Sequence, residues 1–165
     1  MTYELTVELH ESLPASEAVA AAPLRALLER VLREEQVADD CALTLLLAGD
    51  EFLHALNRDH RGVDEPTDVL SFPAAEGEAF PGVAAEGHYL GDIAVAVPLV
   101  RRQGAAAGLA PDDELRHVVL HGLLHLLGYD HETAQQDAAM RAREEAVLGP
   151  GIHAGRTEDG HPGHE

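Results

Sequence analysis

Four stretches of the chain carry the hydrophobic patterns that are typical of β-strands. Residues 2–9 and 90–97 alternate polar and apolar side chains, as a strand with one buried face does. Residues 41–48, CALTLLLA, are almost continuously apolar and predict a buried strand. Residues 68–72, DVLSF, lie between two proline-containing turn signals and predict a further strand.

Other stretches repeat apolar side chains every three or four residues, which predicts α-helices with one buried face. One such helix is expected from residue 16 to about residue 36, where Pro23 marks a break or a new start. Further helices are expected over residues 50–57, 98–109, 111–127 and 133–148.

The last two predicted helices carry end signals. Pro111 suits a first helical turn, and the three acidic residues after it interact favourably with the positive end of the helix dipole. Gly128 stands where a residue in the left-handed conformation would end that helix. Thr133 and Gln136 have the spacing of a capping box, in which two side chains satisfy the first backbone amides of the next helix.

The remaining segments are predicted to be turns and loops. Residues 58–67 are rich in turn-forming side chains, and residues 74–88 contain three glycines and a proline. After Gly149 the chain loses both its periodicity and most of its apolar content. We therefore predict one domain over residues 1–149 and a disordered, histidine-containing acidic tail over residues 150–165.

Composition restricts the class of protein. The 165 residues are enough for one domain, and 45% apolar residues are typical of a globular chain. All 11 basic residues are arginines, and 30 acidic residues bring the net charge to −19, so no basic stripe of the nucleic-acid-binding kind is present. No stretch approaches the ~20 apolar residues that span a membrane, and the first residues lack a secretory-signal pattern. With a single cysteine, Cys41, these features predict a soluble cytoplasmic protein without an internal disulfide.

The stretch HGLLHLLGYDHE, residues 121–132, carries the most informative pattern. His121 and His125 are four residues apart on a predicted helix, so their Cβ atoms lie on one face about 5–6 Å apart. Both imidazoles can then reach one ion at Zn–N distances of about 2.0–2.1 Å. Gly128 permits a sharp turn that brings His131 back toward the same point. Three histidines without a fourth protein ligand are typical of a catalytic zinc, whose open position holds water.

A single histidine on a helix is usually a satisfied polar residue, but three at this spacing, with the glycine between them, favour a metal site. The spacing resembles the metzincin zinc-protease signature, H-E-x-x-H-x-x-G-x-x-H, with one departure. Gly122 stands where the protease has its glutamate general base. Because such a base contributes about 10²–10⁴-fold to the rate, a protease-like hydrolase is the least favoured interpretation.

Three stretches together resemble the YbeY family of metal-dependent endoribonucleases. They are LNRDHRGVDEPTDVLSFP over residues 56–73, LGDIAVAV over residues 90–97 and ELRHVVLHGLLHLLGYDHE over residues 114–132. With the flanking helices, the resemblance covers residues 2–148 and leaves the tail outside. It implies an α+β fold, with one small mixed sheet of about four strands, helices packed around it, and the metal-binding helix on the sheet.

The resemblance also implies a site and an activity. The metal ligands of the family fall on His121, His125 and His131, and its functional arginine falls on Arg61, where the family's Y-R-G reads H-R-G with His60. Family members are implied to cleave single-stranded RNA, to form the 3′ end of 16S ribosomal RNA and to act in ribosome quality control. The implied cofactor is one Zn²⁺ ion, although three histidines do not distinguish zinc from nickel, cobalt or manganese. The implied partners are single-stranded ribosomal RNA, the small ribosomal subunit and assembly factors, with neither DNA nor a membrane.

The residue type of Arg61 fits a role in this chemistry. A guanidinium group can hold a phosphate through two hydrogen bonds and can stabilise negative charge that develops in a transition state. The alternative is a surface arginine paired with Asp59 or Asp64. RNA also carries its own nucleophile, the 2′-hydroxyl, so the sequence leaves open whether that hydroxyl or water attacks.

Several nearby residues are weaker candidates. His117 lies one helical turn before the first predicted ligand, and we expect it to support the site or to pack rather than to bind metal. Asp68 and Ser71 either line a cleft or serve the turn and the strand edge. Arg101 and Arg102 form the one adjacent basic pair, for which a solvated surface is favoured over RNA contact.

The acidity of the chain is unusual for an enzyme that acts on RNA, because it weakens non-specific binding. One explanation is that a partner brings the protein to its RNA. A second hypothesis, from another class, is a zinc-binding ribosome assembly factor whose contacts matter more than any cleavage. Metal-independent binding to the small subunit would favour that hypothesis.

Overall fold

The computed structural model of the chain describes residues 3–37, 41–74, 88–129, 132–149 and 152. The strands are β1 (Glu4–Leu9), β2 (Cys41–Ala48), β3 (Val69–Pro73) and β4 (His88–Ala96). The helices are α1 (Ala21–Glu34), α2 (Asp50–Leu56), α4 (Val97–Ala106), α5 (Pro111–Leu126) and α6 (Ala134–Leu148). Two shorter turns complete the described elements, a 3₁₀ turn η1 (Ala15–Glu17) and a π-helical turn η2 (Asn57–Arg61).

The four strands form one mixed sheet in the order β1-β2-β4-β3. Strands β1, β2 and β4 run parallel, and β3 pairs antiparallel with β4. In that pairing Val69 lies opposite Val95, and Pro73 lies opposite Gly91. The predicted α+β class with a small mixed sheet is therefore confirmed, and β3 forms one edge of the sheet.

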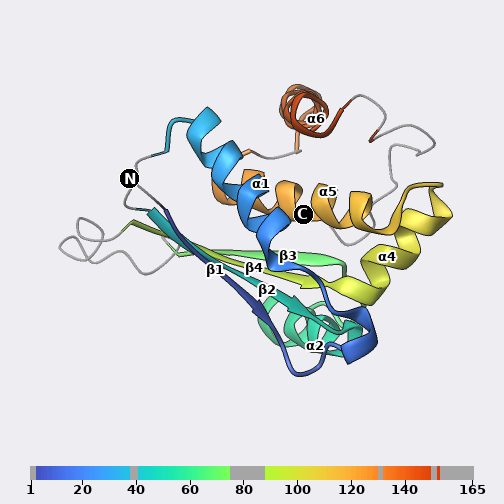
Figure 1. The fold of residues 1–165 in the computed structure, drawn as a ribbon. Coiled ribbons are helices and arrows are strands. Elements are labelled where there is room, and N and C mark those ends of the chain that lie inside the picture. The colour runs from blue at the N-terminus through green and yellow to red at the C-terminus, as the bar shows by residue number, and fades with distance from the viewer. Residues whose placement is uncertain (1–2, 38–40, 75–87, 130–131, 150–151, 153–165) are drawn as a thin grey trace.

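Helices cover the two faces of the sheet unequally. Figure 1 shows α1 and α5 across one face, α6 outside α5, and α2 on the opposite face. The side chains of β2 alternate between two cores: Leu43, Leu45 and Leu47 join the main core with α1 and α5, whereas Leu46 packs against the smaller cluster with α2. Burial on both faces explains why this strand is nearly continuous in apolar residues.

Most predicted elements agree with the structure within a few residues, but two segments differ. The predicted helix over residues 16–36 is divided into η1 and α1, because Pro23 lies in the first turn of α1, where its missing amide is not needed. The predicted turn over residues 58–67 begins as part of η2, which Gly62 ends in the left-handed conformation with φ of 74°. The predicted loop over residues 74–88 lies almost wholly outside the described residues.

The helices α5 and α6 begin as predicted. Pro111 opens α5, and Asp112 and Asp113 follow in its first turn. The hydroxyl of Thr133 accepts from the Gln136 amide at 3.1 Å, and the Gln136 side chain accepts from the Thr133 amide at 3.2 Å, which confirms the capping box. Within the described part of the chain, no helix combines the length and the apolar character needed to cross a membrane.

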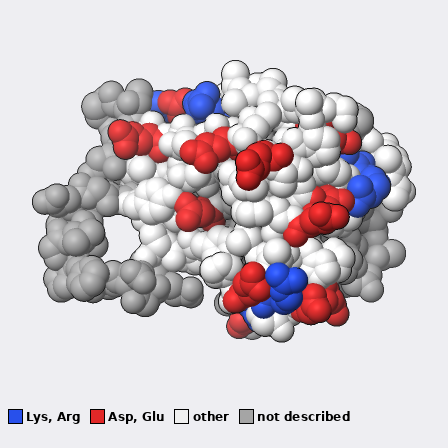
Figure 2. All heavy atoms as spheres, turned by 90° about the horizontal axis from the view of Figure 1, so that it is seen from below, with Lys and Arg blue, Asp and Glu red and all other residues white. Residues whose placement is uncertain are grey.

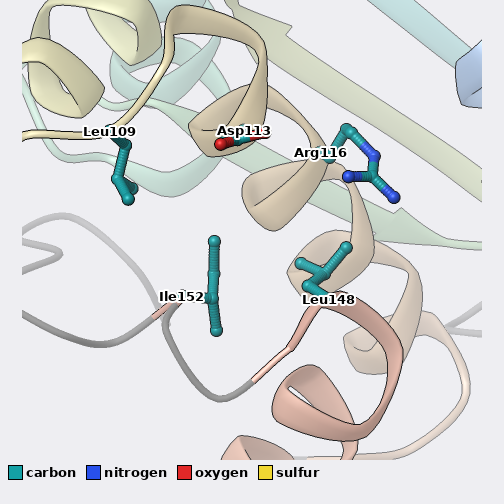
Figure 3. Close-up of a pocket in the computed structure, with 5 residues that line it drawn as sticks. All are labelled: Leu109, Asp113, Arg116, Leu148 and Ile152. Carbon is teal, nitrogen blue, oxygen red and sulfur yellow. The ribbon is translucent and has the colours of Figure 1, made fainter.

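Packing continues beyond the predicted end of the domain at residue 149. Ile152 is buried, and its amide donates to the carbonyl of Gly149 at 3.2 Å. It lines a hollow of about 280 Å³ between the beginning of α5 and the end of α6 (Figure 3), together with Leu109, Asp113, Arg116 and Leu148. The rest of the predicted tail, residues 150–151 and 153–165, lies outside the described residues.

Candidate metal centre

His121 and His125 lie one turn apart near the end of α5, with their rings close together. The ring centroids are 4.7 Å apart, and the two Nε2 atoms approach to 3.2 Å. Two ligands of one tetrahedral zinc ion, each bound at about 2.0–2.1 Å, lie about 3.3 Å from each other. The two histidines therefore meet at the separation that a shared metal ion requires, and the donor set fits zinc.

The carboxylate of Glu144, on α6, holds the far side of the His121 ring. The Nδ1 atom of His121 donates to Oε2 of Glu144 at 2.8 Å. A carboxylate in its ionised form can only accept, so this contact favours the tautomer of neutral His121 that has its proton on Nδ1 and its lone pair on Nε2, the atom that faces His125. Metal-binding histidines commonly donate their second ring N–H to a carboxylate in this way.

His117 binds the other oxygen of Glu144 and extends the network into the core. Its Nε2 atom lies 2.9 Å from Oε1 of Glu144, and its Nδ1 atom lies 3.2 Å from Oε1 of Glu114. The three side chains are at most 3% exposed. Burial opposes the charged ring, but the hydrogen bonds to the two carboxylates outweigh it and raise the pKa of His117 to about 9. These contacts favour the cationic form of the His117 ring, which holds the carboxylate of Glu144 beside His121.

Another side of α5 rests on the sheet through Gly122. A Cβ atom at Gly122 would lie 2.8 Å from Cγ2 of Ile93, 3.2 Å from Oγ of Ser71 and 3.3 Å from Cγ2 of Val69. The Ser71 hydroxyl donates to the Gly122 carbonyl at 3.0 Å. No room exists for the glutamate that a metzincin protease carries at this position, so the packing argues against the protease interpretation.

The turn after α5 is a Schellman cap, in which Gly128 adopts a φ of 105°. The Gly128 amide donates to the His125 carbonyl at 3.1 Å, and the Tyr129 amide donates to the Leu124 carbonyl at 2.9 Å. The chain then enters residues 130–131, so the predicted ligand His131 lies outside the described residues. The residues that are described contain no group of three or more possible metal ligands, and the described site is the pair of histidines on α5.

Arg61 is the last residue of η2, on the segment that follows α2. Its Nη1 atom donates to Oδ1 of Asn57 at 3.3 Å. Asn57 is buried and in turn donates to the carbonyl of Glu65 at 2.9 Å. A neutral oxygen, itself fixed by the turn, therefore helps to orient the guanidinium. Single π-helical turns of this kind are frequent at functional sites.

Asp59 and Asp64, the aspartates that could pair with Arg61 at the surface, each contact another basic side chain. Asp59 pairs with Arg58 at 2.9 Å, and this contact lowers the pKa of the Asp59 carboxyl below its usual value. Asp64 lies 2.8 Å from Nε2 of His54.

Strand β3 connects the Arg61 segment to the histidine helix. His60, the residue before Arg61, packs edge-on against the ring of Phe72, with centroids 5.8 Å apart. Ser71, the neighbour of Phe72 in β3, points to the other face and binds Gly122 of α5. Because α2 and α5 lie on opposite faces of the sheet (Figure 1), the turn with Arg61 and the helix with the histidines meet at the same edge strand from its two sides.

The adjacent basic pair is engaged in ion pairs. Arg101 binds Glu17 at 2.9 Å and Asp112 at 3.2 Å, and Arg102 binds Asp50 at 2.7 Å. Figure 2 shows the face that bears α2, where acidic side chains are spread widely and each basic group adjoins an acidic one. Among the described residues, this face therefore offers no basic track for an RNA backbone, as the net charge predicts.

A cleft of about 470 Å³ opens on the face of the sheet that carries α2. Its lining includes the aromatic residues Phe52 and Phe72, next to His60, and the carboxylates of Glu8 and Asp92. Carboxylates disfavour a phosphate, whereas aromatic side chains are surfaces on which the unstacked bases of single-stranded RNA bind.

Two carboxylates of the metal centre were not predicted from the sequence. Glu144 belongs to a stripe with Met140 and Val147, the other buried residues of α6. A glutamate within a helical apolar stripe is the signal that could have indicated a buried partner. Glu114 precedes His117 by one turn, but in the sequence it is indistinguishable from an ordinary acidic first turn.

The two weaker candidates near the edge strand are Ser71, in β3, and Asp68, just before it. Ser71 ties β3 to α5. Asp68 is buried just before the strand, and its carbonyl accepts from the amide of Ala96 at 2.9 Å.

The mixed four-stranded sheet and the helix packed on it define a small α+β protein, and its candidate metal site is a histidine pair in contact with a buried carboxylate. The family model described as Endoribonuclease YbeY matches residues 8–150, and the chain belongs to this family. The resemblance found in the sequence motifs is thereby confirmed.

Individual relatives agree with this assignment over nearly the whole chain. A protein of Chloroflexus aggregans named Endoribonuclease YbeY is 47% identical over 151 residues, which are 90% of this chain and 95% of that protein. A protein of the same name from Pelotomaculum thermopropionicum is 39% identical over 145 residues, 88% of this chain and 94% of its own. A solution structure from Thermotoga maritima matches with a TM-score of 0.55 and 27% identity, over 98% of this chain and 99% of that one.

Proposed function

We propose that this protein is a single-strand-specific, metal-dependent endoribonuclease that holds one Zn²⁺ ion on His121, His125 and His131. The observation that carries the proposal is the approach of the His121 and His125 Nε2 atoms to 3.2 Å, while Nδ1 of His121 is bound to Glu144. The name Endoribonuclease YbeY of the similar proteins supports RNA as the substrate. A zinc-binding ribosome assembly factor whose contacts matter more than any cleavage is not favoured by these similarities.

The residues of the chain have separate tasks in this proposal. The ion, when bound, would polarise the scissile phosphate and lower the proton affinity of an attacking oxygen. His121 and His125 would hold the ion, and His131, the third proposed ligand, follows the cap at Gly128 in the sequence. Arg61 binds a phosphate of the RNA through paired N–H groups and stabilises the negative charge that develops during cleavage.

Single-stranded RNA suits the rest of the surface. Phosphate contacts are restricted on a chain of net charge −19, so base contacts must contribute much of the affinity. The cleft with Phe52 and Phe72 supports such contacts, because aromatic rings bind bases that a duplex would keep stacked.

The cellular substrate in this proposal is the 3′ end of 16S ribosomal RNA, with a second role in ribosome quality control. The small ribosomal subunit and assembly factors are the proposed partners, and the cytoplasm is the proposed location. The acidic surface supports delivery by such a partner, because non-specific attraction to RNA is weak at this charge.

Removal of the metal tests this function directly. The protein, loaded with one zinc ion per chain, is expected to cleave a labelled single-stranded RNA and to spare a duplex of the same sequence and the matching single-stranded DNA. Dialysis against a chelator should abolish cleavage, and one equivalent of Zn²⁺ should restore it. Cleavage that persists unchanged in the zinc-free, folded protein would contradict the proposal. The product ends then identify the nucleophile, since a cyclic phosphate results from attack by the 2′-hydroxyl.

The substitution Arg61→Ala is expected to reduce kcat/KM for single-stranded RNA by about 10²–10³-fold, the usual effect of removing a group that stabilises developing charge. Arg61→Lys should recover only part of this loss, because an ammonium group lacks the paired N–H geometry. The measurement is cleavage kinetics at fixed zinc loading and ionic strength.

Arg58→Ala is the matched control for Arg61, because it removes the same charge from the same turn while Arg58 pairs with Asp59. Arg58→Ala should keep kcat/KM within about threefold of the wild-type value, as expected for loss of an exposed ion pair. Equal losses in the two variants would show a general charge effect and would remove the specific role of Arg61.

A further inference from the structure

We propose that Glu144 is a positioning residue that fixes the orientation and the tautomer of His121 and thereby sets the affinity of the histidine pair for a metal ion. The inference rests on the proposed function in one respect, namely that His121 and His125 share an ion. Glu144 itself lies on another helix and faces the opposite side of the His121 ring.

Both oxygens of Glu144 are engaged, and each has a different task. Oε1 accepts from Nε2 of His117 at 2.9 Å, which anchors the carboxylate in the core. Oε2 accepts from Nδ1 of His121 at 2.8 Å, which leaves Nε2 of His121 as the atom with a lone pair. A carboxylate that only balanced the charge of His117 would not need the second contact. The ring that it orients is one that meets His125 at metal-sharing distance.

The Glu144 carboxylate is held in one position by the packing around it, so it can fix the orientation of the His121 ring. Met140 and Val147 are also buried, and they flank Glu144 on the same face of α6. Arg143, the residue before Glu144, links α6 to the end of α1 by ion pairs with Glu35 at 2.7 Å and Glu34 at 3.2 Å. Because Glu144 is also nearly inaccessible to water, its hydrogen bonds are not exchanged for solvent contacts.

An amide at this position weakens the arrangement in either of its two orientations. Glutamine has the shape of glutamate but offers only one acceptor oxygen, whereas His117 and His121 each present an N–H to this side chain. In Glu144→Gln, the amide N–H₂ therefore faces one of the two rings. When it faces His121, Nδ1 must accept, the proton moves to Nε2, and the lone pair for the metal is lost. When it faces His117, His121 keeps its tautomer but donates to a neutral amide oxygen instead of a carboxylate, so its Nε2 atom is a weaker base and a weaker ligand.

We expect Glu144→Gln to weaken zinc binding by about 10–100-fold, the usual effect of removing a carboxylate that orients a ligand histidine. Zinc affinity is measured by competition with a chromophoric chelator at one pH, on proteins whose folding is checked by circular dichroism. The neighbouring Glu145→Gln removes the same charge from the same helix and should retain the wild-type affinity.

Glu114→Gln separates positioning from general support of the core. Glu114 belongs to the same buried network and contacts His117, so this variant should lower the melting temperature of the zinc-free protein. It should leave the zinc affinity unchanged, because the Glu144–His121 contact remains. Equal zinc affinity in Glu144→Gln and the wild type, or equal losses in Glu144→Gln and Glu114→Gln, would overturn the proposal.

A measurement on the unmodified protein keeps the proposal testable if Glu144→Gln does not fold. A long-range ¹H–¹⁵N spectrum of the zinc-free wild type should report His121 with its proton on Nδ1 and with an unprotonated Nε2. The opposite tautomer would overturn the proposal. If the wild type shows this tautomer yet takes up no zinc, the proposed metal-dependent function fails. The effect of Glu144 on zinc affinity then fails as well, whereas the effect of Glu144 on the His121 tautomer stands.

Discussion

His125→Ala is expected to reduce RNA cleavage by at least ~10³-fold and to lower the zinc content well below one ion per chain. The metal ion in the proposed mechanism supplies several kcal/mol of stabilisation to the transition state, and about 4 kcal/mol corresponds to ~10³-fold in rate. Removing His125, one of the proposed ligands, leaves His121 without the partner that its Nε2 atom faces at 3.2 Å. Cleavage of a single-stranded RNA and metal analysis of the same preparation measure both effects.

The variant should remain folded, because His125 is only partly buried and lies in the last turn of α5, outside the buried contacts of His117 and Glu144. Circular dichroism and thermal unfolding check this point. His54→Ala is a suitable control, since it removes a partly buried histidine of α2 that pairs with Asp64 and lies outside the histidine pair and the lining of the cleft. Equal cleavage by a folded His125→Ala variant would place the chemistry at another centre or in a contaminating nuclease.

Gly122→Glu is expected to prevent stable folding. A Cβ atom alone would approach Ile93 to 2.8 Å, and overpacking of this kind costs about 1–3 kcal/mol. The carboxylate would then enter the interface between α5 and the sheet, which adds several kcal/mol for a buried charge without a partner. The sum approaches the ~5–15 kcal/mol total stability of a typical domain. Urea unfolding, or the absence of a cooperative transition, measures the effect.

Gly122→Ala gives the same test at a smaller amplitude. The added methyl group gains about 1 kcal/mol of helix propensity but loses about 1–3 kcal/mol by overpacking, so we expect a net loss of about 1 kcal/mol. Ala138→Glu, on the exposed side of α6, is the control for introducing a glutamate and should change stability by less than ~0.5 kcal/mol. Wild-type stability of Gly122→Glu would mean that α5 is not seated on β3 and β4 at this point.

The local elements of the site follow from the sequence. The i, i+4 spacing of His121 and His125 predicts rings on one face, and the structure brings their Nε2 atoms to 3.2 Å. Gly128 ends α5 as expected, because only a residue tolerant of positive φ completes that cap without strain. The capping box of Thr133 and Gln136 is likewise a contact between residues three positions apart.

The π-helical form of η2 was not predicted. Residues 58–67 carry many turn-forming side chains, and this composition does not distinguish a π-helical turn from a series of β-turns. The buried Asn57, which binds the backbone of Glu65 and the side chain of Arg61, is a feature of the folded turn. The orientation of Arg61 therefore depends on contacts that composition does not reveal.

By itself, the sequence determined the strands, the helices, the histidine pair, the glycine turn and the family, because each depends on periodicity or on residues a few positions apart. The tertiary structure alone decided which groups meet from distant parts of the chain. Glu144 reaches His121 across 23 residues, and Ser71 reaches Gly122 across 51. Those contacts depend on how α5 packs against α6 and the sheet, and the same glutamate or glycine on a differently packed helix would meet solvent instead. A helical pattern specifies which face is buried, whereas the partner of each buried polar group is set by the packing of all the elements together.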